Sequence, residues 1–138
     1  MKYLLDTNVI SELQKTKCNE SVKSFADKIS WENFYISAIT IGELSYGIEK
    51  LPVGKKKHDL AVWLYSEVPQ WFNRRIIPMD TEVLLEWGKI RAGTERTLPV
   101  ADTLIAAAAI THHMILVTGN VKDFDDIEGI NLLNPWEF

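Results

Sequence analysis

Short apolar runs separated by longer amphipathic stretches are the dominant pattern of this chain. The apolar runs have the length of strands that are covered on both faces, and they occupy residues 3–5, 34–36, 75–77, 114–117 and 130–133. Between them, apolar residues recur with helical spacing, which predicts helices over residues 19–29, 38–51, 58–72, 81–92 and 100–113. A further helix begins near Val9, Pro52 ends the helix that starts at residue 38, and Pro69 interrupts the next one.

The alternation of strands and helices predicts the fold class. Parallel neighbours need a crossover connection, and a helix usually provides it, so the pattern favours an α/β fold with a mainly parallel central sheet. The chain has 138 residues and no internal repeat, low-complexity tract or linker, so we expect a single domain over residues 1–138. Ligands of open parallel sheets bind beyond the carboxyl ends of the strands, and functional residues are expected at that edge.

Composition and charge narrow the classes of function. The formal net charge is −4, so the chain as a whole does not attract nucleic acid, and any polyanion must be bound locally. Cys18 is the only cysteine, which excludes an internal disulfide and a cysteine zinc site and favours a cytoplasmic location. The longest apolar run, residues 104–110, is well short of the ~20 residues that span a membrane, so no membrane partner is expected.

Four acidic residues lie at the ends of predicted strands or helices. Each has an ordinary structural explanation when taken alone. Asp6 or either of its two neighbours can cap the helix that follows, Asp102 complements a helix dipole, and Asp123 has the spacing of a capping pair with Asn120. Glu43 lies to one side of the apolar face of its helix and is explained as a solvated surface residue.

Two glycines, Gly42 and Gly47, lie beside Glu43 inside its predicted helix. Each costs roughly 1 kcal/mol of helix stability relative to alanine. They therefore indicate that something packs closely against this helix.

The four acids gain a different meaning when they are taken together. All are predicted at one edge of the sheet, where hydroxyl and amide side chains accompany them: Thr7, Asn8, Thr118 and Asn120. Carboxylates brought close together repel one another unless a cation lies between them. Oxygen ligands without cysteine favour a hard cation, Mg²⁺ or Mn²⁺, and such an ion supports phosphodiester hydrolysis by lowering the pKa of a bound water.

Four segments carry a resemblance to a known family: LLDTNVISEL, SAITIGELSYGIEKL, LPVADTLIAAAAITHHMILVTGNVKDF and NLLNPW. They span nearly the whole chain and occur in the family's order. On these segments the chain resembles the PIN-domain family, and within it the VapC-type toxins of type II toxin–antitoxin pairs, closest to their FitB-like subgroup. The resemblance implies a three-layer α/β/α sandwich with a mainly parallel sheet.

The resemblance also implies roles for individual residues. It implies that an acidic quartet carries out metal-dependent endoribonuclease catalysis and binds Mg²⁺ or Mn²⁺: Asp6, Glu43, Asp102 and Asp123. Asp6 and Asp102 match the positions tied most directly to the metal. Supporting positions are matched by Thr7, Asn8, Ser37, Thr118 and Asn120. The chain departs from the family at Gly119, where many members have a basic residue.

The partners expected from the resemblance are an RNA substrate, a cognate antitoxin of the VapB or FitA type, operator DNA bound through that antitoxin, and a second copy of the chain in a homodimer. RNA binding requires a basic rim around the acids. Its candidates are Lys55, Lys56, Lys57, Arg74, Arg75, Arg91 and Arg96. The five tryptophans are interpreted as packing residues of the core or of an interface, which is where aromatic side chains usually lie.

Two alternative functions compete with the nuclease interpretation. An aspartyl-phosphate phosphotransferase also has an Asp after the first strand of an α/β sheet, although Asn8 stands where the haloacid-dehalogenase pattern has a second Asp. The other alternative is a non-catalytic PIN-like module that acts only through antitoxin and operator DNA. The complete quartet favours catalysis over this alternative.

Overall fold

A parallel sheet of five strands forms the centre of the computed structural model, which describes residues Met1 to Phe138. The strands are β1 (Tyr3–Leu5), β2 (Phe34–Ser37), β3 (Ile76–Ile77), β4 (Ile115–Val117) and β5 (Leu132–Leu133). Their order across the sheet is β3-β2-β1-β4-β5, and every neighbouring pair is parallel. Each of the five apolar runs of the sequence is thus a strand, and the prediction of an α/β fold is confirmed.

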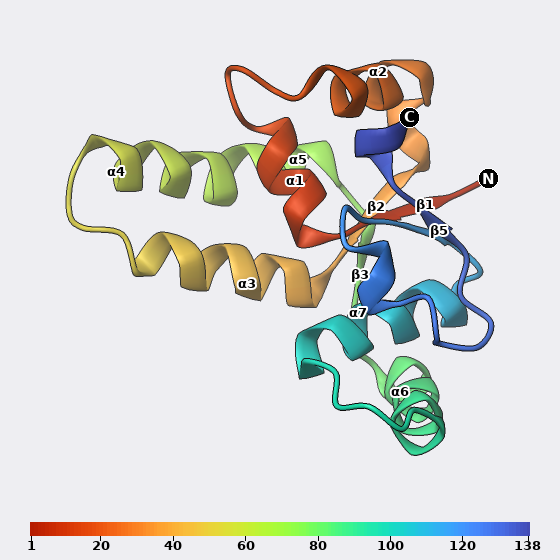
Figure 1. The fold of residues 1–138 in the computed structure, drawn as a ribbon. Helices are drawn as coiled ribbons and strands as arrows, with labels where there is room; N and C mark the ends of the chain where they lie inside the picture. Colours follow the sequence, from red (N-terminus) through yellow and green to blue (C-terminus); the bar gives the residue numbers. More distant parts are fainter.

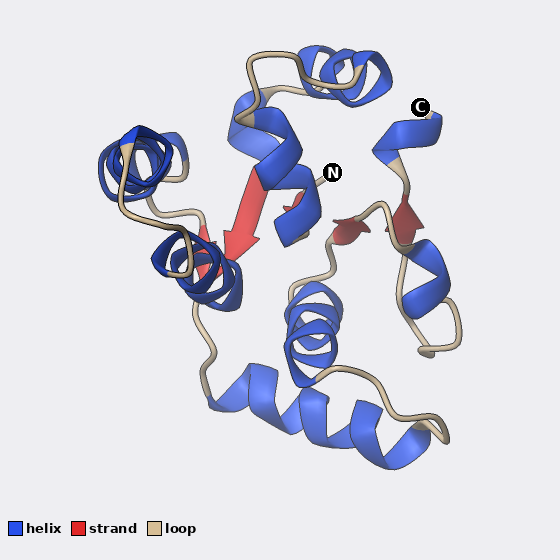
Figure 2. Cartoon of the chain, turned by 60° about the vertical axis from the view of Figure 1, so that its left-hand side comes forward, coloured by secondary structure: helices blue, strands red, loops and turns tan.

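The two faces of the sheet are buried in separate cores because neighbouring residues of a strand point in opposite directions. Leu4 and Leu116 belong to a core with helices α6 (Thr81–Gly93) and α7 (Val100–Thr111). Leu5 and Val117 belong to a second core on the other face. Figure 2 shows the strands between these two groups of helices, and the three-layer α/β/α sandwich is confirmed.

The second core is covered by helices from the first half of the chain. These are α1 (Thr7–Leu13), α2 (Glu20–Lys28), α3 (Ala38–Glu49), α4 (Lys55–Val62) and α5 (Val68–Trp71). Helices α3 and α4 run side by side and project from the body of the molecule (Figure 1). Aromatic rings pack against this core, and Trp31 contacts Trp71 edge-to-face at a centroid distance of 5.8 Å.

Helix α7 passes through the interior, as its uninterrupted apolar sequence indicates. Ile105 and the four alanines at 106–109 are fully buried. Small side chains allow the helix to lie close to the sheet and to α6, whose Trp87 Nε1–H donates to Thr103 Oγ1 at 2.9 Å. Because α7 runs opposite to the strands it connects, it begins at their carboxyl edge and ends at their amino edge.

The helix predicted over residues 58–72 differs from the prediction in its start and in its irregularity. It begins at Lys55, and the chain stays helical through Pro69, with a π-helical segment over Trp63–Glu67 in between. The proline ring clashes with the carbonyl four residues earlier in a regular α-helix, and that carbonyl belongs to Tyr65. The wider π turn accommodates this clash, so the irregularity lies before the proline rather than at it.

The termini of the elements agree with local sequence signals. Asn19 Oδ1 accepts hydrogen bonds from the backbone N–H groups of Ser21 and Val22 and so caps α2, and Asp80 caps α6 through Val83 N–H. Three short 3₁₀ turns lie at Trp31–Asn33, Val121–Asp123 and Pro135–Glu137. None of the helices is both long enough and apolar enough to cross a bilayer.

Candidate active site

Asp6 lies where β1 ends and α1 begins, and it is almost fully buried, with 5% of its surface exposed. Its Oδ1 accepts the backbone N–H of Thr7 at 2.8 Å, so it caps α1. Its Oδ2 accepts the hydroxyl of Thr118 at 2.7 Å. Burial raises the pKa of Asp6, these two hydrogen bonds oppose the rise, and repulsion from Glu43 and Asp123 adds to it. Capping and a place in the site are therefore compatible roles of one side chain.

Glu43 enters the site from α3 through a network of hydroxyl groups. Thr7 Oγ1 donates to Glu43 Oε1 at 2.6 Å and lies 3.1 Å from Thr40 Oγ1. Ser37 caps α3 by accepting Thr40 N–H at 3.2 Å. Ser37 and Thr40 are fully buried, so the network fixes where Glu43 points, and the surface explanation for this residue is wrong.

Thr40 was not among the residues selected from the sequence. It precedes Glu43 by three positions in the same helix, and residues with this spacing lie on one helix face. That spacing is the signal that links it to the site.

Asp102 stands in the first turn of α7. Burial raises its pKa to about 6, and repulsion from Asp6, Glu43 and Asp123 adds to the rise. Asp102 therefore lies within electrostatic reach of the other three quartet members, and Asp6 within reach of Glu43 and Asp123, although the four come from separate parts of the chain.

Asp123 follows β4 in the 3₁₀ turn Val121–Asp123. The expected capping role of Asn120 is wrong, because its side chain accepts no hydrogen bond from this turn. Instead, Thr118 Oγ1 accepts the backbone N–H of Asn120 at 3.0 Å, and Asn8 contacts the same loop by accepting Gly119 N–H at 3.4 Å. Arg96 supports the turn from outside by donating to the backbone carbonyl of Asp123 at 2.8 Å.

The quartet has no positive partner within the protein. The ion pairs of the structure are Lys15–Glu12, Lys55–Asp59 and Arg96–Asp126, and none includes a quartet residue. No group of three or more His, Cys, Asp or Glu side chains is arranged to hold a metal ion. Mg²⁺, however, typically keeps several waters and takes only one or two protein carboxylates. The oxygen-only donors and the raised pKa values of Asp6 and Asp102 fit such a cation.

Gly119, where the family pattern often has a basic residue, is covered by the ring of Trp136. A Cβ atom at position 119 would lie 2.8 Å from Trp136 Cζ3, which is closer than packed carbon atoms approach. The two residues come from the loop after β4 and from the 3₁₀ turn at the C-terminus. The absence of a basic side chain at 119 is therefore a packing requirement of this chain.

The expected close approach at Gly42 and Gly47 does not occur within the chain. A Cβ atom at either position would have no heavy atom within 4 Å. Gly47 instead lines a cavity beside Glu43, so packing within the chain does not explain these glycines.

Several of the candidate basic residues already have partners. Arg75 donates to the backbone carbonyls of Phe34 and Trp71, Arg96 forms a two-bond pair with Asp126, and the Arg91 guanidinium lies over the Trp87 ring. These contacts reduce the number of basic side chains that are free to contact a polyanion.

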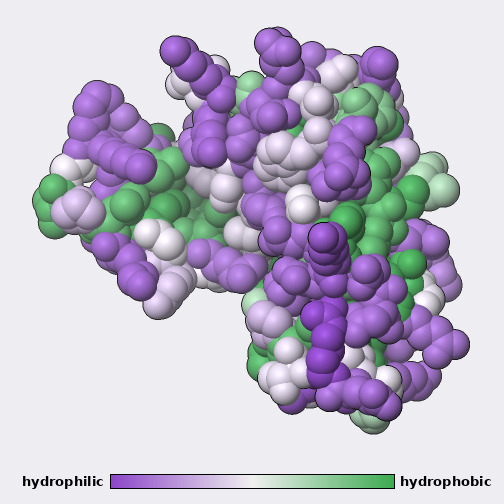
Figure 3. All heavy atoms as spheres, in the orientation of Figure 1, coloured by the Kyte–Doolittle hydropathy of each residue, from purple (hydrophilic) through white to green (hydrophobic).

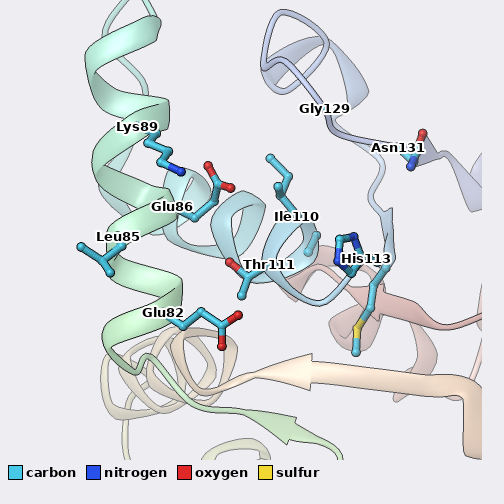
Figure 4. A pocket seen from close by; sticks show the side chains of 11 residues that line it. Glu82, Leu85, Glu86, Lys89, Ile110, Thr111, His113, Gly129 and Asn131 are labelled. Atoms are coloured by element: carbon cyan, nitrogen blue, oxygen red, sulfur yellow. The ribbon is translucent and has the colours of Figure 1, made fainter.

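A large cavity lies away from the quartet, at the opposite edge of the sheet. Its volume is about 590 Å³, and its lining includes Met114 and Asn131, which directly precede β4 and β5. Figure 4 shows Glu82, Glu86 and Lys89 of α6 along one side of it. No residue selected from the sequence as functional lines this cavity.

Comparisons with known proteins agree on one family. A family model described as PIN domain matches residues 3–130. The chain is 36% identical to "Toxin FitB" of Neisseria gonorrhoeae, over 96% of this chain and 97% of that protein. It is 33% identical to "VapC ribonuclease Y4jK" of Sinorhizobium fredii, over 97% of each.

Solved structures give the same result. The crystal structure of FitAcB from Neisseria gonorrhoeae superposes with a TM-score of 0.90 at 35% identity and covers 99% of both chains. The structure of VapBC2 from Rickettsia felis, bound to a DNA fragment from their promoter, has a TM-score of 0.77 at 29% identity, with 97% of this chain and 98% of that chain covered.

Proposed function

Because the chain belongs to the PIN-domain family and, within it, to the VapC-type toxins, we propose that it is the toxin of a type II toxin–antitoxin pair and acts as an endoribonuclease that requires Mg²⁺ or Mn²⁺. Ribonuclease activity is the property named for the relative of Sinorhizobium fredii. The proposal extends that activity to this chain.

One observation carries the proposal. The carboxyl groups of Asp6 and Asp102 have raised pKa values chiefly because burial disfavours their charged forms, and repulsion from other quartet acids adds to the rise. A structural role would be satisfied by a neutral side chain at less electrostatic cost. Retaining four coupled acids is understandable if a divalent cation and an RNA phosphate occupy the edge of the sheet during the reaction.

The protein groups have distinct tasks in this proposal. Asp6 and Asp102 would hold the cation, which when bound supplies Lewis acidity to the phosphate and lowers the pKa of water. Thr118 orients Asp6 through the 2.7 Å hydrogen bond from its hydroxyl group. Thr7 orients Glu43 through its 2.6 Å hydrogen bond, and Glu43 or Asp123 would orient the attacking water or accept its proton.

The proposed partners are an antitoxin of the VapB or FitA type and, through it, operator DNA. The support is the likeness to FitAcB and to VapBC2 bound to promoter DNA. We also propose a homodimer in the cytoplasm. Exposed apolar side chains on α6, Leu84 and Leu85 with 43% and 66% of their surfaces exposed, are available for contact with another chain.

The test is cleavage of a panel of structured RNAs by purified protein freed of antitoxin. We expect cleavage with Mg²⁺ or Mn²⁺, none in EDTA, and none by Asp6→Asn or Asp102→Asn. Glu86→Gln, at the cavity of Figure 4, is the matched control and should cleave like the wild type.

The competing outcome identifies a non-catalytic module. If wild-type protein cuts no RNA better than the two Asp variants, or cuts equally well in EDTA, the nuclease proposal is wrong. Growth arrest on expression that persists in Asp6→Asn would then indicate action through binding alone.

A further inference from the structure

A groove adjoins the quartet between helices α1, α3 and α4. Its volume is about 250 Å³, and Thr7 and Glu43 belong to its lining. Since Thr7 donates to Glu43 at 2.6 Å, the groove is continuous with the acidic site. Figure 3 shows hydrophobic residues exposed between the projecting helices, with hydrophilic residues around them.

One of three consecutive lysines at the start of α4 is free and lines this groove. Lys55 pairs with Asp59 at 2.6 Å, and Lys57 donates to the backbone carbonyl of Glu49 at 3.1 Å. Lys56 has no hydrogen bond or ion pair, and it shares the groove lining with Glu43. An unpaired ammonium group in the lining of a groove that reaches Glu43 is placed to bind an anion that enters this groove.

One residue in the lining of the groove has a buried hydrogen-bond donor without a partner. Trp63 lines it and is only 6% exposed, yet its indole N–H has no partner. Buried donors are nearly always paired in native proteins. Trp63 opens the π-helical segment, and such segments are frequent at functional sites.

The groove has room beside an aromatic and aliphatic wall. Gly47 lines it, and a Cβ atom there would meet nothing within 4 Å. The volume of about 250 Å³ lies below the range of about 300–1,000 Å³ that drug-sized ligands fill, so a single planar ring suits it better than a larger group.

We propose that this groove binds the unpaired nucleotide next to the scissile phosphate of the RNA, with Lys56 on the phosphate of that nucleotide and its base against the wall formed with Trp63. Single-stranded RNA is recognised in this way, by cations along its backbone and by pockets for unstacked bases. The inference rests on the proposed ribonuclease function and names the part of the substrate that this groove takes.

The first test measures binding of a single-stranded RNA to the Asp6→Asn protein, which keeps the RNA intact. Adding Lys56→Gln should weaken binding about fivefold and should reduce the slope of log K against log salt by about 0.7, the value for one phosphate contact on a single strand. Lys55→Gln and Lys57→Gln remove the same charge from neighbouring positions and should change the slope by less than half as much. In the wild-type background, Lys56→Gln should raise KM and leave kcat within about twofold.

The second test fills the groove without removing any contact. Gly47→Ala should weaken RNA binding about fivefold or more, which corresponds to loss of roughly one stacked base. Gly42→Ala in the same helix, which also meets nothing within 4 Å and does not line the groove, is the matched control. An RNA that lacks only the base beside the mapped cleavage position should bind both variants equally.

The outcomes separate this inference from the proposed function. If wild-type protein cleaves RNA but Lys56→Gln leaves the salt slope unchanged, or Gly47→Ala and Gly42→Ala bind RNA equally, the inference is wrong and the nuclease stands. If no RNA is cleaved, the nuclease proposal fails, and the binding experiments still show whether the groove binds RNA. Loss of antitoxin binding in Gly47→Ala with unchanged RNA binding would assign the groove to a protein segment and overturn the inference.

Discussion

The two ends of helix α7 carry opposite arrangements of charge. At its amino end, Asp102 faces three other acids with no cation among them, and its pKa is raised to about 6. At its carboxyl end, a cavity of about 590 Å³ is lined by Glu82, Glu86 and Lys89, which Figure 4 shows as a mixture of both signs. The lining of this cavity therefore combines acidic and basic side chains, whereas no ion pair includes any of the acids around Asp102.

This difference shows which property identifies the site. Cavity volume alone would select the carboxyl end of α7, where no residue was assigned a functional role from the sequence. The carboxylates without a positive partner indicate the amino end of α7 instead. This end lies at the carboxyl edge of the parallel sheet, where such sheets bind ligands. The predictions below concern residues of the acidic site, and the first three compare them with residues that line the cavity at the carboxyl end of α7.

The largest difference is expected in RNA cleavage. Asp102→Asn should reduce kcat/KM by about 1,000-fold or more, since it removes an acid proposed to hold the cation, whose Lewis acidity is worth several kcal/mol. Glu86→Gln should stay within about twofold of the wild type, because surface changes away from the chemistry have little effect. Initial rates on one cleaved RNA measure both, and equal losses would refute the distinction between the two ends.

The next difference concerns two threonines. Thr118→Val removes the hydroxyl that donates to Asp6 at 2.7 Å and should reduce activity about 10–100-fold, as is typical when a partner of a metal ligand is lost. Thr111→Val at the far end of α7 removes a buried hydroxyl that has no partner. That variant should keep full activity and unchanged or higher stability. Rates and urea unfolding of both variants test this, and a loss of activity in Thr111→Val would contradict it.

A smaller difference is expected in the stability of the metal-free protein at pH 7. Asp102→Asn should raise the free energy of unfolding by about 1–2 kcal/mol, because burial and repulsion from the other acids disfavour the ionised carboxylate, a cost that solvent screening reduces. Glu86→Gln should change it by less than about 0.5 kcal/mol. Urea unfolding in EDTA provides the values. Added Mg²⁺ should stabilise the wild type more than Asp102→Asn, since ligand binding to the native state adds to stability.

The smallest effect is the pH dependence of that stability. The folded-state pKa of Asp102, about 6, exceeds its ordinary value of 3.8, so the folded protein binds the proton more tightly than the unfolded chain. Its contribution to the stability of metal-free protein is complete below pH 3.8 and is lost as pH rises through 6, with a slope under about 1 kcal/mol per pH unit. The free energies of unfolding of the wild type and Asp102→Asn are measured at a series of pH values, and their difference isolates the contribution of Asp102. If the wild type instead gained stability relative to the variant as pH rises, the raised pKa of Asp102 would be contradicted.

Much of the fold and of the quartet followed from the sequence because their causes are local. Apolar runs gave the five strands, and helical spacing gave most helices, while strand ends placed Asp6 and Asp123 at one edge. Family motifs added the residue roles, which remain predictions, as does the extent of the domain over residues 1–138.

What could not be predicted depends on contacts between distant residues. The sequence pattern does not reveal that Lys55 and Lys57 have partners while Lys56 has none. These partners depend on how the chain folds around three adjacent residues of the same type. The π-helical segment Trp63–Glu67 depends on how the chain relieves the clash at Pro69, and a proline signals only that some relief is needed.

The ring of Trp136 over Gly119 constrains how this family member can change through mutation. A side chain at 119 meets the ring at 2.8 Å, and a smaller residue at 136 alone leaves a void over the loop that carries Asn120 and Asp123. A protein with either substitution alone is therefore expected to be less stable, whereas the two substitutions together restore packing. Among descendants of this chain, a basic residue at 119 is expected to occur together with a small residue at 136, so the two positions are expected to change together during evolution.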